Sequence, residues 1–193
     1  MVIGIDYGSK LAGTTAICFR NENNYQILQS KKNQDADIFI LELLASLQPE
    51  VIGIDAPLSI PMVLRNEKTV LKHDYFYREA DRQLKAMSPM FLGGLTARAM
   101  KLKYQILSHY PMCKVIEVYP KALIDTLYNK EYYNKKNKQG IAPFISSNEE
   151  LFPLHNFKSW HAVDSYLAYH SAIRHRDGKA VGYGNENEGI IWV

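Results

Sequence analysis

The chain has 193 residues, of which 47% are hydrophobic and 22% are charged, as in ordinary globular proteins with an apolar core. Lys and Arg number 23 against 20 Asp and Glu, and the resulting net charge of +3 permits a phosphate-bearing partner but is too small to indicate one. Cys18 and Cys113 lack metal-ligand spacing, and no apolar run approaches a membrane span or a signal peptide. We therefore expect buried thiols in a cytoplasmic protein.

The first part of the chain carries short apolar runs separated by turn signals. Residues 2–5 predict a buried strand that ends at Asp6. Residues 14–20 and 25–31 predict two further strands, and the turn 21–24 lies between them. Three strands joined by short turns favour an antiparallel meander.

A helical pattern follows the meander. The apolar residues between 38 and 47 have helical spacing, and Pro49 lies just beyond them. Residues 51–54 then form another short apolar run, which ends at Asp55. A strand, a crossover helix and a further strand predict a parallel βαβ unit, so the order to this point is βββαβ.

The rest of the chain is mainly helical, with one clear strand. The sequence predicts a strand at 115–118 and a small added strand at 189–193. It predicts helices at 78–87, 97–109, 121–133 and 160–174. The whole chain is thus predicted to be one α/β domain, with a helical insertion at about 60–112.

Two of the predicted strands end in the same four residues, Ile-Gly-Ile-Asp, and these place Asp6 and Asp55 at strand ends. In open α/β sheets, ligands bind at the carboxyl ends of the strands. If the two strands are neighbours, the two carboxylates lie close together and repel one another. A hard divalent cation removes this repulsion, and Mg²⁺ prefers oxygen ligands.

Two more acidic residues lie among apolar neighbours, where a carboxylate needs a partner. Glu117 lies within the predicted strand at 115–118, and Asp164 lies on the last predicted helix. His161 precedes Asp164 by three residues, so both can share one helical face. With Asp6 and Asp55, these acids could surround a pair of Mg²⁺ or Mn²⁺ ions that catalyse phosphodiester hydrolysis.

Each of these residues also has a structural alternative. Asp6 could cap the turn that follows it, and Asp55 could form an Asx turn. Glu117 could pair with a buried arginine, and Asp164 could bind a backbone group or a tyrosine. His161 could be a structural helix histidine.

Basic residues near the acids are candidate phosphate ligands. Arg78 and Arg82 are one helical turn apart and could grip a phosphate together, with Lys10 as a third candidate. The alternative is a solvated helix face, or a pairing of Arg78 or Arg98 with Glu117. Residues 132–138 combine two tyrosines with three lysines, a pattern that could contact a nucleic acid but is more typical of a solvated loop.

Five segments occur in an order that resembles a known family: IGIDYGSKLAGT, IGIDAPLSIP, READRQLK, EVYP and HAVDSYLAY. This is a bacterial and archaeal family of uncharacterised proteins, described as predicted nucleases of the RNase H fold and distantly similar to RuvC-type resolvases. The resemblance implies a mixed five-stranded sheet in the order 3-2-1-4-5, helices on both faces, and an insertion after strand 4. It also implies that Asp6, Asp55, Glu117 and Asp164 occupy the family's acidic positions.

The leading hypothesis is therefore a metal-dependent nuclease or phosphodiesterase. Asp6, Asp55, Glu117 and Asp164 would hold Mg²⁺ or Mn²⁺ and act in catalysis. Lys10, Arg78, Arg82 and His161 would bind the substrate, which is DNA, RNA or a nucleotide-type phosphoester. A homodimer would suit a resolvase-like enzyme.

Two alternatives keep the fold and change the function. The segment DYGSKLAGT also resembles the phosphate loop of the actin and sugar-kinase ATPases, and Gly93-Gly94 is a weak candidate for their second loop. The other alternative is a binding module whose acids are structural.

Overall fold

The computed structural model describes residues 1–22, 24–65, 74–152 and 156–193, and part of the predicted insertion lies outside them. The strands are β1 (Val2–Asp6), β2 (Ala16–Asn21), β3 (Asn24–Gln29), β4 (Val51–Asp55), β5 (Lys114–Val118), β6 (Gly182–Asn185) and β7 (Gly189–Trp192). They form one sheet in the order β3-β2-β1-β4-β5-β7-β6. None of the helices in the described ranges has both the length and the apolar character that crossing a bilayer would require.

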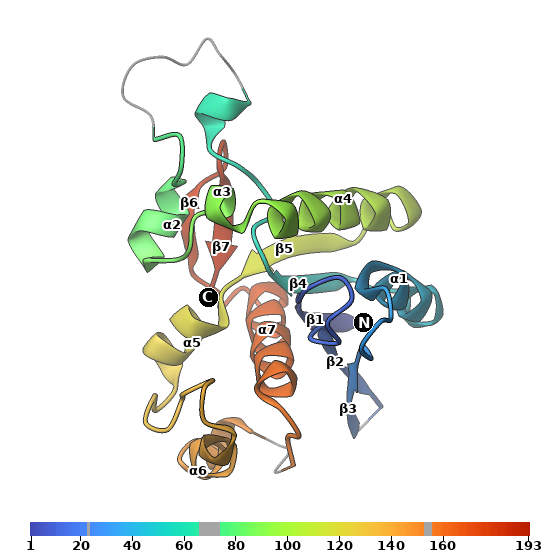
Figure 1. The fold of residues 1–193 in the computed structure, drawn as a ribbon, viewed down its shortest axis with the longest axis vertical. Helices are drawn as coiled ribbons and strands as arrows, with labels where there is room; N and C mark the ends of the chain where they lie inside the picture. The colour runs from blue at the N-terminus through green and yellow to red at the C-terminus, as the bar shows by residue number, and fades with distance from the viewer. Residues whose placement is uncertain (23, 66–73, 153–155) are drawn as a thin grey trace.

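Helices connect β3 to β4, β4 to β5 and β5 to β6. The α-helices are α1 (Ala36–Leu47), α2 (Glu79–Leu84), α3 (Pro89–Leu92), α4 (Gly94–His109), α5 (Pro120–Leu127), α6 (Ile141–Ser146) and α7 (Trp160–Arg176). Three short 3-10 helices are η1 (Met62–Leu64), η2 (Lys138–Gly140) and η3 (Glu149–Leu151). Figure 1 shows α7 in the middle of the molecule, with α1 and α4 on one side of it and α5 and α6 on the other.

The sheet confirms the predicted order 3-2-1-4-5 and extends it. Strands β1, β2 and β3 pair antiparallel, and β1, β4 and β5 pair parallel. The expectation of five strands is wrong in detail, because the sheet has two more. Strand β7 pairs with β5 in parallel, and β6 pairs antiparallel with β7 and forms the edge of the sheet. The small strand predicted at 189–193 is part of this addition, whereas β6, with its two glycines, shows little apolar pattern.

Apolar residues cover both faces of the sheet. On one face, α5, α6 and α7 bury Leu123, Phe144, Val163 and Leu167 against the strands. On the other face, α1 and α4 bury Ile40, Leu44 and Leu102 against Ile3, Ile52 and Ile54. Both cysteines are buried free thiols, as the sequence predicts.

Helix α5 is shorter than the predicted helix at 121–133. It ends at Leu127, and Tyr128 has extended backbone with φ −111° and ψ 153°. The side chain of Asn148 accepts a hydrogen bond from the Asn129 amide and donates one to the Asn129 carbonyl, which fixes the turn. As a result, residues 129–137 form a loop that leads back to the sheet.

Candidate metal centre

Two aspartates lie side by side where β1 and β4 end. The two Ile-Gly-Ile-Asp segments pair in register, so Asp6 lies directly opposite Asp55 on the neighbouring parallel strand. Adjacent strands in a sheet are about 4.8 Å apart. The repeated motif predicts that both aspartates lie at strand ends, and the pairing of the two strands in register makes them neighbours.

The third aspartate comes from α7, which packs directly on the glycines of the same two strands. A Cβ atom added at Gly4 would lie 2.0 Å from the Tyr169 nitrogen, and one added at Gly53 would lie 2.8 Å from the Ala168 carbonyl oxygen. No larger residue fits at Gly4 without moving the helix. This close approach places Asp164, which is 1% exposed, beside the two strand-end acids.

Asp55 has no hydrogen-bond partner among the described residues. Burial raises the pKa of its carboxyl well above the usual range, and the neighbouring Asp6 and Asp164 carboxylates raise it further. A half-buried carboxylate in this position must either hold a proton or be neutralised by a cation.

Asp6 is paired with His161. The His161 Nδ1 atom lies 2.7 Å from Asp6 Oδ2, and this contact raises the pKa of the imidazole. His161 is exposed on its outer side, so the ring stands at the surface of the site and not within the core.

Asp164 is held by two residues of the loop that follows α5. The Tyr133 hydroxyl donates a hydrogen bond of 2.8 Å to one carboxylate oxygen, and Lys135 Nζ lies 2.5 Å from the other. Burial raises the pKa of Asp164 to about 6, while the Lys135 charge acts in the opposite direction. Asp164 thus contacts a tyrosine, as its structural alternative anticipates, but it also faces the two strand-end acids.

Sequence reasoning does not assign Tyr133 and Lys135 to the site. A helix through residue 133 would carry both away from the sheet, whereas the loop turns them toward it. The structure places Tyr133 through ring contacts with Phe144 and Trp160, whose centroids lie 5.4 and 5.2 Å from its own. The aromatic residues of this region are visible in the sequence, but their contacts depend on the fold and cannot be deduced from spacing.

Glu117 and Arg78 form a buried ion pair, which is the structural alternative to their predicted roles as metal and phosphate ligands. Arg78 is fully buried, and its two terminal nitrogens lie 2.7 and 2.6 Å from the Glu117 carboxylate oxygens. The Leu58 amide donates a third hydrogen bond, of 2.8 Å, to Glu117. The sequence analysis allows this pairing as the structural alternative, and it leaves neither group free.

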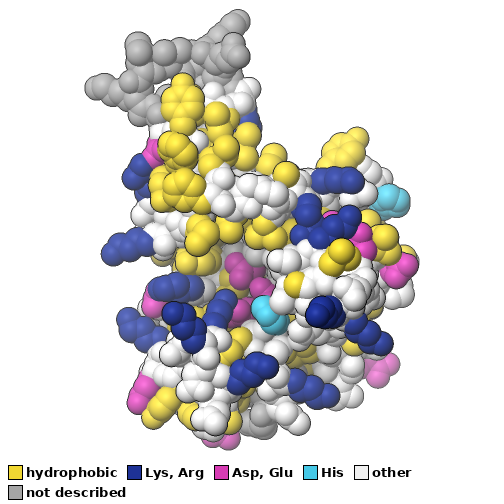
Figure 2. Space-filling model, viewed as in Figure 1, with side chains coloured by type: hydrophobic (Ala, Val, Ile, Leu, Met, Phe, Trp, Pro, Cys, Tyr) yellow, Lys and Arg dark blue, Asp and Glu magenta, His cyan; other side chains and the backbone are white. Residues whose placement is uncertain are grey.

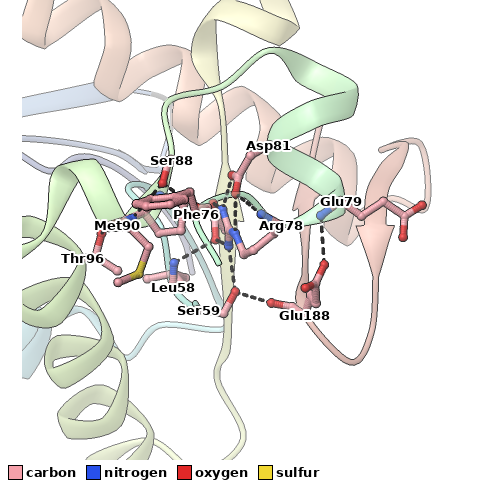
Figure 3. Close-up of polar contacts among 12 residues, drawn as sticks. Leu58, Ser59, Phe76, Arg78, Glu79, Asp81, Ser88, Met90, Thr96 and Glu188 are labelled. Carbon is pink, nitrogen blue, oxygen red and sulfur yellow. Dashed lines mark hydrogen bonds and ion pairs between the residues drawn. The ribbon is translucent and has the colours of Figure 1, made fainter. Parts of the chain in front are cut away.

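The same arginine ties the insertion to the sheet. Arg78 also binds both carboxylate oxygens of Asp81, at 3.0 and 2.6 Å, and the Ser59 hydroxyl at 2.7 Å. Glu188, from the β6–β7 turn, accepts hydrogen bonds from the amides of Met62 and Glu79. The start of α2 is therefore fixed to β5 through Glu117 and to the added hairpin through Glu188. Figure 3 shows the contacts that Arg78 makes with Asp81 and Ser59, and the contact between Glu188 and the Glu79 amide.

The remaining predicted substrate ligands lie at the surface. Lys10 Nζ pairs with Asp35 at 3.1 Å, and Arg82 pairs with Asp74 and lies over the ring of Tyr77. Both cations are more than half exposed and do not contact the acids.

A second ion pair holds the loop after β1. Arg98 binds both carboxylate oxygens of Asp37, at 3.1 and 2.7 Å, and donates to the Gly8 carbonyl at 3.2 Å. The Tyr7 hydroxyl donates to Asp37 at 2.5 Å, and the Arg98 guanidinium lies 4.8 Å from the Tyr7 ring centre. This network fixes the backbone on the C-terminal side of Asp6.

The acids open into a cavity of about 330 Å³ whose lining includes Asp6, Asp55 and Glu117. Figure 2 shows acidic side chains at the bottom of a hollow, with Lys and Arg below and beside it and a hydrophobic area above. This charge arrangement suits a ligand that carries negative charge, provided that a cation first neutralises the acids.

The donor chemistry of the three aspartates fits a hard divalent ion, and the Asp55 carboxylate has no hydrogen-bond partner in the described part of the chain. In the present side-chain arrangement, no group of three or more His, Cys, Asp or Glu side chains within the described ranges has ion-binding spacing. One oxygen of Asp6 and both of Asp164 face His161, Tyr133 or Lys135.

Comparison with known proteins gives a distant structural likeness. No protein-family model and no curated protein matches the chain. Among solved structures, the chain is similar to the Thermus thermophilus RuvC structure, with 14% identity and a TM-score of 0.45, over 93% of this chain and 98% of that one. At this distance, function has to be argued from the residues of the site.

Proposed function

We propose that the protein is a divalent-metal-dependent phosphodiesterase that acts on a nucleic acid. The observation that carries the proposal is the state of Asp55. Its carboxylate has no hydrogen-bond partner among the described residues, and the nearby Asp6 and Asp164 carboxylates raise its pKa. Asp6 and Asp164 have polar partners, whereas the Asp55 carboxylate has none in the described ranges, and this favours a cation bound at the cluster.

Asp6, Asp55 and Asp164 would hold Mg²⁺ or Mn²⁺. When bound, such an ion lowers the pKa of a coordinated water and stabilises charge on a phosphoryl oxygen. Glu117 is outside the ligand set in this proposal, because Arg78 and the Leu58 amide bind its carboxylate.

Two cations of the chain are placed to act on the substrate. Lys135 contacts Asp164 and His161 contacts Asp6, so both could turn to a phosphate oxygen once a metal ion takes their place. Lys10 and Arg82 are exposed and would contact phosphates farther along the strand.

The deciding experiment is a calorimetric titration of Mn²⁺ into the wild type, Asp55→Asn and Asp177→Asn. Asp177 caps the far end of α7, pairs with Arg176 and provides the matched control. We expect the wild type and the control to bind Mn²⁺ and Asp55→Asn to bind it at least about tenfold more weakly. The same three proteins are then tested for cleavage of single-stranded, duplex and branched DNA and RNA in Mg²⁺ and Mn²⁺.

The alternatives give different results in this experiment. If the wild type binds no Mn²⁺, with or without an oligonucleotide present, the acids are structural and the protein is a binding module. If ATP binds and oligonucleotides do not, the phosphate-loop resemblance describes the site better. Metal binding together with cleavage that Asp55→Asn lacks supports the proposal.

A further inference from the structure

The cavity beside the three aspartates has a chemically mixed lining. Its acidic residues are Asp6, Asp55, Asp81 and Glu117, of which the last two are bound by Arg78. Met87, Leu92 and Leu95 of the helical insertion are among its apolar residues, and Tyr7 and Tyr119 also line it. The volume of about 330 Å³ falls at the lower end of the range for small-molecule sites.

This combination restricts the occupant. A purely apolar group, such as a side chain of a partner protein, would remove water from the acids without neutralising them. A free phosphate or a metal ion alone would leave the apolar lining residues in contact with water. A nucleotide suits both kinds of lining, because its base is a flat apolar ring system and its phosphate is the group that the metal-bound acids attract.

The surface around the cavity continues the same chemistry. Phe76 and Phe91 are 52% and 63% exposed, with ring centroids 5.6 Å apart, and Met87 is 61% exposed. Figure 2 shows hydrophobic side chains forming one area directly above the acidic hollow. Exposed aromatic side chains next to a phosphate-binding region are typical of surfaces that stack unpaired bases.

We infer that this cavity is a nucleobase pocket, which holds the base next to the phosphate that lies at Asp6 and Asp55. The inference rests on the proposed function and specifies its substrate. A base stacked in a duplex cannot reach a cavity between the sheet and the insertion, so the substrate has an unpaired nucleotide at this position. The base is carried either by a strand or by a free nucleotide.

The test uses single-stranded DNA that contains the fluorescent base 2-aminopurine, with Ca²⁺ as the divalent ion. We expect binding to change the fluorescence of the analogue and to exceed the binding of the matching duplex by about tenfold or more. Ala86→Trp should fill the cavity and weaken single-strand binding about tenfold, and Met87→Ala should weaken it severalfold. Adenosine monophosphate is added as a competitor, and displacement at equal concentration would identify a free nucleotide as the source of the base.

The control is Met112→Ala. Met112 is 91% exposed and precedes β5 at the end of the sheet opposite the acids, so its replacement should leave binding unchanged. Thermal unfolding establishes that each variant is folded, and Met87, as an exposed residue, gives a variant that does not disturb the core. The inference is overturned if duplex binds as tightly as single strand, or if both cavity variants bind like the wild type. Mn²⁺ binding that depends on Asp55 would still stand in that case, so the two proposals fail separately.

Discussion

At the scale of single residues, the site is defined by how each carboxylate is neutralised. His161 faces Asp6, and Lys135 and Tyr133 face Asp164. The Asp55 carboxylate has no hydrogen bond within the described residues, although the nearby Lys135 charge lowers its pKa. Because Lys135 occupies a carboxylate oxygen that a metal ion would use, it competes with the metal as long as no substrate is present.

Replacing Lys135 by Met should therefore tighten Mn²⁺ binding about tenfold in the absence of substrate, while reducing cleavage. The titration belongs well above pH 6, since the pKa of Asp164 lies at about 6. As the pH falls through that value, protons compete with the metal and the affinity of the wild type should decrease. In Lys135→Met this decrease should begin at a higher pH, because the Lys135 charge lowers the pKa of Asp164. Lys10→Met serves as the control, because Lys10 pairs with Asp35 and not with the acids. Weaker Mn²⁺ binding by Lys135→Met would contradict the assigned competition.

The strand-end acids are the residues that sequence reasoning predicts best. Asp6 and Asp55 follow from a repeated motif, whose meaning depends only on strands having carboxyl ends at one edge. The roles of Glu117 and Arg78 are harder to predict from the sequence. A buried acid and an arginine thirty-nine residues apart can be separate ligands of metal and phosphate, or partners in an ion pair. Spacing cannot separate these two cases, and the structure assigns the ion pair.

At the scale of elements, the insertion depends on buried charge rather than on apolar packing alone. Arg78 joins α2 to β5 through Glu117, and Glu188 joins the same helix to the β6–β7 turn. Breaking a buried pair leaves an uncompensated charge, which costs more than the pair itself contributes.

Arg78→Met should lower the free energy of unfolding by about 3–5 kcal/mol, since Glu117 and Asp81 lose their partner together. Arg82→Met provides the comparison on the same helix. Arg82 is 62% exposed, and its removal should change stability by less than about 1 kcal/mol. Chemical denaturation of both variants measures the difference, and equal losses would show that the Arg78 network does not hold the insertion.

Two elements differ from the sequence-based expectation for identifiable reasons. Helix α5 ends early because the Asn148 side chain binds the backbone of Asn129. These residues are 19 positions apart in the sequence, so a local pattern does not reveal the contact. Strand β6 carries two glycines and little alternation, so its place in the sheet comes from pairing with β7. Tertiary contacts decide both cases, whereas local pattern suffices for β1, β4 and α7.

At the scale of the whole molecule, α7 connects the sheet to the site. The helix crosses the middle of the molecule in Figure 1, and its backbone lies on Gly4 and Gly53. The glycines of the repeated motif therefore set how near Asp164 approaches the two strand-end aspartates.

Gly53→Ala should destabilise the protein by about 1–3 kcal/mol and weaken Mn²⁺ binding, because its Cβ would meet the Ala168 carbonyl oxygen at 2.8 Å and move the helix outward. Gly94→Ala is the control, since its Cβ would have open space around it. Denaturation and metal titration of both variants give the comparison. A folded Gly53→Ala protein with unchanged metal affinity would show that the helix position does not control the site.

The contact of α7 with the two glycines also has a consequence for biosynthesis. Asp6 and Asp55 are made early, but Asp164 is added only when the last long helix has been translated and has docked on the sheet. A nascent chain that still lacks α7 has neither the third carboxylate nor His161, which faces Asp6. In the proposed enzyme, the complete metal site therefore forms only after the last long helix has docked on the sheet.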